Sequence, residues 1–76
     1  MAKNYVHFVA DDQYGNVCIL ETHEPEGHRL KVKNILKRLR EEHPRCGPIV
    51  EWRTDLTAIE LLQRLKSQRT ARESAA

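Results

Sequence analysis

The sequence has little of what a membrane segment, a secretory signal or a phosphate-binding loop requires. No apolar run approaches the roughly 18 residues of a membrane helix. The first ten residues contain Lys3, Asn4 and His7 where a secretory signal would have an apolar core. The three glycines stand singly in turn-like stretches, so the sequence contains no glycine-rich phosphate loop. These absences predict a cytoplasmic protein that does not enter the membrane.

Cysteine is scarce and the chain is short. The two cysteines, Cys18 and Cys46, form no C-x-x-C pair, and isolated cysteines in the cytoplasm are usually reduced. A chain of 76 residues forms one domain at most. Domains of this size have a thin stability margin and often gain stability from a metal or from a second copy of themselves.

The residue patterns that support catalysis are also missing. Serine occurs only at Ser67 and Ser74, and there is no G-x-S-x-G or H-E-x-x-H motif. His43 and Cys46 have the spacing of a base and a thiol. However, they lie at a proline-flanked helix exit in a domain too small to offer an obvious water-excluding site. The sequence therefore predicts a protein that is not an enzyme and has no cofactor.

A zinc site is the main alternative use of the histidines. His23 and His28 form one candidate pair, and His43 and Cys46 form another. Zinc accepts both ligand types but needs four that converge. A helix from Arg29 to His43 would hold the pairs about 22 Å apart at 1.5 Å per residue. Solvent-exposed histidines are the expected outcome, and no metal site is predicted.

Charge is distributed unevenly along the chain. Residues 1–27 contain one lysine and five carboxylates, whereas residues 28–46 contain seven lysine or arginine residues and two glutamates. The formal net charge is only +2, so the chain has an acidic first third and a basic middle.

Hydrophobic periodicity predicts three strands and two helices. The expected strands are residues 3–10, 17–21 and 48–53, and the expected helices run from about Arg29 to His43 and from Thr57 onward. Alternatively, residues 29–33 form a short additional strand, and the first helix begins after it with Asn34 as its N-cap. Thr57 and Glu60 fit a capping box, and Asp55 is a rival cap.

These elements predict an α+β fold in the order ββαβα, with a three-stranded sheet and two helices packed on one of its faces. Residues 1–66 are expected to form the domain, and residues 67–76 to form a frayed polar tail. In this arrangement the other face, which carries Tyr5, His7 and Val9, has no helix to cover it. An exposed apolar face on a small protein usually marks an interface.

The leading hypothesis is a non-enzymatic module that binds a larger protein and modulates or inhibits it, by strand addition or through an aromatic patch. The expected contact residues are Tyr5, His7, Trp52 and Arg53. The same surface is alternatively a homodimer interface. Taken as a complete gene product, a chain this short and rich in arginine, without catalytic motifs, is typical of bacterial, plasmid or phage accessory proteins. No motif is specific enough to name a family.

The alternative hypothesis is a nucleic-acid-binding protein that uses its basic first helix. The residues expected to contact phosphates are Lys33, Lys37, Arg38 and Arg40. Against this, Lys37 with Glu41 and Arg38 with Glu42 are spaced as ordinary i, i+4 ion pairs of a solvated helix.

Overall fold

The computed structural model describes residues 4–24 and 30–75, and its elements confirm the α+β fold in the order ββαβα. The elements are β1 (Tyr5–Asp11), β2 (Val17–His23), α1 (Val32–Glu42), β3 (Val50–Thr54) and α2 (Ala58–Ala75). In the part of the chain that is described, no helix is long and apolar enough to cross a membrane.

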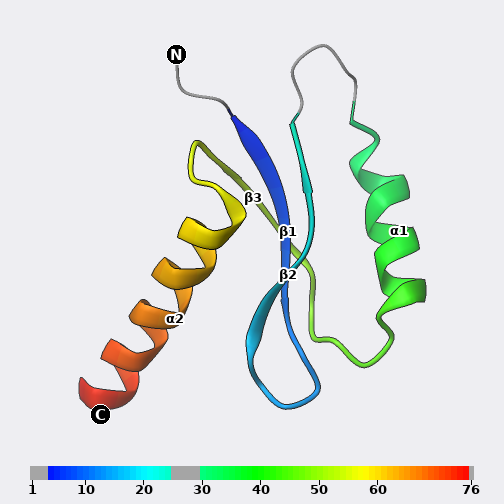
Figure 1. Cartoon of the computed structure of the whole chain (residues 1–76). Coiled ribbons are helices and arrows are strands. Elements are labelled where there is room, and N and C mark those ends of the chain that lie inside the picture. The colour runs from blue at the N-terminus through cyan, green and yellow to red at the C-terminus, as the bar shows by residue number, and fades with distance from the viewer. Residues whose placement is uncertain (1–3, 25–29, 76) are drawn as a thin grey trace.

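The strands form one antiparallel sheet in the order β2-β1-β3, with β1 in the centre (Figure 1). The β1–β2 turn is fixed by Asp12, whose Oδ1 accepts hydrogen bonds from the backbone N–H groups of Tyr14 and Asn16 at 2.8 and 2.9 Å. Gly15 has a φ of +81°, a conformation that glycine adopts at no steric cost. The chain then crosses through α1 to reach β3 on the other side of β1.

The two helices lie on opposite faces of the sheet, so the prediction that both pack on one face was wrong (Figure 1). Every residue of β1 from Val6 to Ala10 is buried, which requires cover on both faces because successive strand residues point to opposite sides. The face that we expected to be uncovered is therefore closed by α2. Tyr5 is half-buried there, and His7 and Val9 are buried.

The face under α1 carries the hydrophobic core. Val6 and Phe8 of β1 and Leu39 of α1 are buried together. The half-buried residues packed around them are Leu20, Leu30, Val32, Ile35, Leu36 and Ile49. Val32, Ile35, Leu36 and Leu39 recur at the 3.6-residue period of a helix, which explains why these positions share the side of α1 that faces the sheet.

A β-bulge interrupts the pairing of β1 with β2. Phe8 pairs with Glu21 and Val9 pairs with Ile19, which leaves Leu20 as the additional residue on β2. Leu20 packs against the α1 core. A bulge bends its strand and increases the local twist. The pairing of β1 with β3 has a continuous register, from Tyr5 with Thr54 to Val9 with Val50.

The start of α1 differs from both predicted starts. The helix begins at Val32 with Lys31 at its cap position, neither at Asn34 nor after a third strand. The Lys31 side chain makes no capping hydrogen bond. A lysine ammonium only donates, so it has nothing to offer the free N–H groups of the first turn. Arg29, the predicted first residue, lies outside the described residues.

The start of α2 confirms the predicted capping box. The Glu60 carboxylate accepts hydrogen bonds from the N–H and the hydroxyl of Thr57, and the Glu60 N–H donates to the Thr57 hydroxyl at 3.3 Å. These bonds with Thr57 lower the pKa of Glu60. Asp55 is therefore not the cap.

The end of α2 extends past the predicted boundary. The helix continues to Ala75, where the sequence predicted a frayed tail from Ser67. Arg69 holds this extension against the β1–β2 hairpin, since its guanidinium donates to both Asp11 carboxylate oxygens at 3.0 and 3.1 Å and to the carbonyl oxygen of Gly15. One guanidinium nitrogen, Nη2, donates to both carboxylate oxygens and the other, Nη1, donates to the hairpin backbone, so Arg69 ties the helix to the hairpin at two points.

Candidate interaction surface

Strand β3 lies at one edge of the sheet and presents apolar side chains on the α2 face. Val50 and Trp52 pair with Val9 and His7, so all four side chains share that face. Helix α2 lies closest to β2, on the far side of β1, and covers β3 only in part. Val50 is consequently 51% exposed and Trp52 is 39% exposed, although their partners Val9 and His7 on the same face are buried.

A cleft opens between β3 and the second half of α2. Its cavity volume is about 270 Å³, and it is lined by Val17, Trp52, Leu65, Gln68 and Arg69. We call this the Trp52 cleft. A smaller adjoining hollow of about 150 Å³ shares Val17, Trp52 and Leu65 and extends to Val50 and Pro48. The lining is apolar at Val17, Trp52 and Leu65 and polar at Gln68 and Arg69 of α2.

The structure separates the four predicted contact residues. Tyr5 and Trp52 lie on the α2 face, whereas Arg53 lies on the α1 face and is exposed, where its Nε donates to Glu51 at 2.5 Å. His7 is 0% exposed. It therefore belongs to the core, and a partner has no access to it in this fold. That Tyr5, Trp52 and Arg53 contact a partner stays a prediction.

His7 ties the sheet to the turn that precedes α2. Its Nε2 bonds to the carbonyl oxygen of Leu56 and its Nδ1 bonds to the Thr22 hydroxyl, both at 2.8 Å. A carbonyl oxygen only accepts, so the hydrogen of the first bond belongs to Nε2. The Tyr5 ring stacks over the imidazole with centroids 5.7 Å apart. His7 is thus a buried polar group with both nitrogens satisfied.

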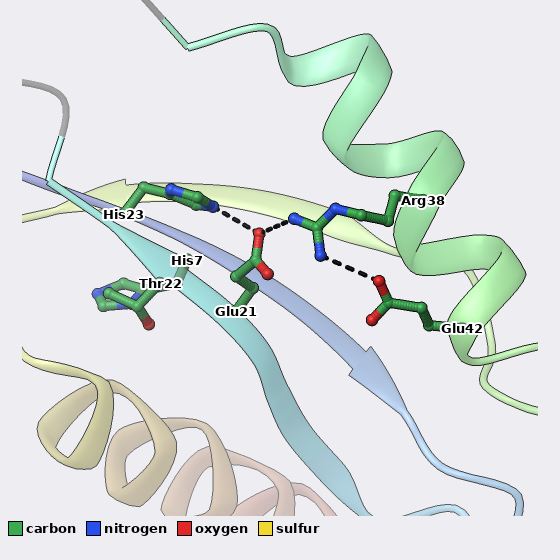
Figure 2. A network of polar contacts seen from close by, with 6 residues as sticks. All are labelled: His7, Glu21, Thr22, His23, Arg38 and Glu42. Atoms are coloured by element: carbon green, nitrogen blue, oxygen red, sulfur yellow. Dashed lines mark hydrogen bonds and ion pairs between the residues drawn. The ribbon is translucent and has the colours of Figure 1, made fainter. Parts of the chain in front are cut away.

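A second polar network lies on the α1 face (Figure 2). The Arg38 guanidinium donates to Glu21 of β2 at 2.5 Å and to Glu42 of its own helix at 3.0 Å, and His23 bonds to the same Glu21 oxygen. Figure 2 shows this network on one side of the sheet, and His7 with Thr22 on the other. The hydrogen bond from Arg38 lowers the pKa of Glu21, and His23 adds to the effect.

The network changes the assignment of the basic helix. Arg38, one of the four predicted phosphate contacts, is held by Glu21 and Glu42. The other three, Lys33, Lys37 and Arg40, are exposed and form no ion pair within the described residues. The predicted i, i+4 pair of Arg38 with Glu42 is present, whereas Lys37 with Glu41 is not. Three cations therefore remain on the outer face of α1.

The predicted absence of a zinc site stays untested for His28, which lies outside the described residues. Among the residues that the structure describes, no group of three or more histidine, cysteine or carboxylate side chains is placed to hold a metal. His23 bonds to Glu21 on the sheet, whereas His43 and Cys46 lie in and after the C-terminal cap of α1. His23 and the candidate pair of His43 and Cys46 are thus at different ends of the α1 face.

Both cysteines are free. The Cys18 thiol donates to the carbonyl oxygen of Ala10 at 3.4 Å. Burial raises the pKa of Cys18, and the neighbouring Cys46 thiol raises it further. A raised pKa keeps a thiol protonated and unreactive at neutral pH, so Cys18 has the character of a structural cysteine.

Sequence reasoning missed Val17 and Val50 as parts of a surface, and it missed Glu21 and His23 as partners of Arg38. The signal for Val50 was present, since Val50 and Trp52 alternate with Glu51 and Arg53 on a strand that follows Pro48. The contact between β2 and α1 had no local signal.

Comparison with protein family models, with curated proteins and with solved structures finds no match for this chain.

Proposed function

We propose that this chain is a small protein-interaction module that acts without catalysis of its own and modulates or inhibits a larger protein that binds at the Trp52 cleft. The observation that carries the proposal is the exposure of Trp52, which lines this cleft, and of Val50, which lines the adjoining hollow. Tryptophan is the residue type most enriched among interface residues with large binding energies. A large apolar side chain from a partner would fill the cleft, and Trp52 would lose its remaining contact with water.

For this larger partner the proposal favours an aromatic patch over strand addition. The Trp52 cleft is formed by side chains on the α2 face, whereas strand addition would use the backbone groups at the edge of β3. It also assigns the protein to the cytoplasm, where two unpaired cysteines stay reduced. An accessory protein of a phage or other mobile element fits this mode of action, in which one protein occupies a surface of another.

Substitution of Trp52 tests the proposal, and Ile59 supplies a matched control. Ile59 is 71% exposed on α2 and does not line the Trp52 cleft. Affinity capture from a native lysate is compared for the wild type, Trp52→Ala and Ile59→Ala, each shown to be folded by circular dichroism. We expect a protein that the wild type and Ile59→Ala retain to be absent with Trp52→Ala. Equal capture by all three proteins would contradict the proposal.

Nucleic-acid binding by α1 is the second candidate function. It is supported by Lys33, Lys37 and Arg40, which are exposed and not in ion pairs within the described residues. Replacing one such residue with Gln should weaken binding to duplex DNA and reduce the slope of log affinity against log salt by about 0.9 for each phosphate that is no longer neutralised. Arg38→Gln is the control, because Arg38 is already held by two glutamates. Binding that does not depend on salt would rule against this function.

A further inference from the structure

We infer that the outer edge of β3 pairs with the β3 edge of a second copy of this chain, with Trp52 on the two-fold axis. The inference concerns the strand edge and goes beyond the proposed partner of the Trp52 cleft, which uses the α2 face. It rests on the regularity and exposure of this edge and on the order of charges along it.

The sheet has two edges, and they differ. Strand β2 carries the bulge at Leu20, and bulges protect an edge by twisting it away from regular pairing. Strand β3 pairs with β1 in an unbroken register, so its outer N–H and C=O groups follow a regular strand. No strand among the described residues pairs with this outer edge.

The residues of β3 show that neither helix covers the strand edge. Val50 and Trp52 are exposed on the α2 face, and the side chain of Arg53 is 61% exposed on the α1 face. Both faces are therefore partly open at β3. The β3 strand of a second copy has room to pair there, and the two three-stranded sheets would then form one sheet of six strands.

Sheet geometry restricts the possible registers. Two antiparallel strands related by a two-fold axis perpendicular to the sheet keep matching faces on the same side, and directly opposed residues share a face. Each residue of β3 is thus opposed by one of the same parity, and the axis passes beside a single residue. The registers that pair three or more residues of β3 centre on Glu51, Trp52 or Arg53.

Charge selects one of these three registers. Centring on Glu51 places Glu51 directly opposite Glu51 of the second copy, and centring on Arg53 places two arginines opposite each other. Centring on Trp52 places Glu51 opposite Arg53 of the second copy, twice. Opposite charges across an antiparallel pair stabilise it, and like charges destabilise it. The edge of β3 is therefore self-complementary in one register only.

The same register brings the exposed apolar residues together. Trp52 lies beside Trp52 of the second copy, and Val50 lies opposite Thr54 of the second copy on the same face. Within one chain, Glu51 and Arg53 already form an ion pair on the α1 face of β3. Both charged groups therefore lie on the face where the cross-strand pairs with the second copy would form. Because a five-residue strand buries less than the ~1,200 Å² of a standard stable interface, we expect dissociation in the micromolar range.

Charge reversal tests the inference, and its matched control is the exchange of both residues. Sedimentation velocity is measured on the wild type, Glu51→Arg, Arg53→Glu and the double variant Glu51→Arg/Arg53→Glu, from micromolar to millimolar protein. We expect a concentration-dependent dimer for the wild type, a shift to monomer for each single reversal, and a restored dimer for the double variant, which recreates both cross-strand pairs in reverse. Circular dichroism confirms that each variant is folded.

The only tryptophan of the chain provides a second readout at the proposed axis. Its emission should shift to shorter wavelength as the wild type is concentrated and should not shift for the single reversals. A wild type that stays monomeric to millimolar concentration, or a dimer that survives the single reversals, would overturn the inference. A folded double variant that stays monomeric would overturn the register. All three variants retain Trp52, so capture of a larger protein at the cleft is measured separately.

Discussion

The two faces of the sheet are closed by different chemistry. Under α1, Val6, Phe8 and Leu39 form a dry cluster, with charged groups confined to its margin. Under α2, the most buried residue of β1 is His7, a polar ring that depends on two hydrogen bonds. One face is closed mainly by apolar area. The other requires particular partners at particular positions.

The difference also determines where the molecule is open. Helix α1 leaves Val6 and Phe8 almost without solvent contact, whereas α2 leaves Trp52 and Val50 exposed beside a cleft. We therefore expect the α1 face to contribute most of the stability, and the α2 face provides the surface that we propose for binding. Three predictions test this division.

The largest effect is expected at Leu39. Leu39→Ala should reduce the free energy of unfolding by about 2–5 kcal/mol, because it leaves a cavity in the buried cluster. Leu61→Ala is the counterpart on the other face, where Leu61 is also buried but α2 borders the Trp52 cleft further along the helix. We expect a smaller cost there. Chemical denaturation measures both, and an equal or larger cost for Leu61→Ala would reverse the comparison.

The second effect is expected at His7. His7→Phe keeps a ring of similar size but leaves the Leu56 carbonyl without its hydrogen bond, at a cost of about 1–3 kcal/mol. Thr22→Val removes only the other bond at an exposed residue and should cost about 1 kcal/mol or less. If His7→Phe is as stable as the wild type in thermal denaturation, the α2 face does not depend on this polar contact.

The smallest effect concerns the charged margin of the α1 face. Arg38 lowers the pKa of Glu21 in the folded state, so the interaction stabilises the fold above the ordinary glutamate value of 4.5 and is lost as the pH falls through the lower folded value. Glu21→Gln should therefore be slightly less stable than the wild type at neutral pH and equal to it in acid. The control is Glu41→Gln on the exposed side of α1. A difference that does not depend on pH would contradict this origin.

Local patterns were sufficient to predict the elements and several of their contacts. The 3.6-residue stripe identified the side of α1 that faces the sheet, and the spacing of Thr57 and Glu60 identified the start of α2. Both signals are complete within a few residues of sequence. The start of α1 was not predictable in this way, because the Lys31 side chain provides no cap.

The placement of α2 depended on information that is spread along the chain. Residues Tyr5 to Ala10 form a nearly continuous apolar and aromatic run, which is typical of a strand buried on both faces. His7 is a polar residue within this run and suggests that buried and exposed residues alternate along the strand, whereas residues 6–10 are all buried. Its partner Leu56 is 49 residues away, and Arg69 reaches Asp11 across 58 residues. Neither contact leaves a periodic signal.

The central position of β1 has a consequence for the time course of folding. As the chain is synthesised, β1 and β2 are completed early, and their hairpin forms from local contacts. The third strand and the Leu56 carbonyl follow only after α1 has been made, so His7 waits for its second partner until 49 further residues have been added. Contacts this distant in sequence are also the slow ones to form in a free chain. We therefore expect the hairpin with α1 to be an early, partly solvated species, and the docking of β3 and α2 to be the step that completes the native state.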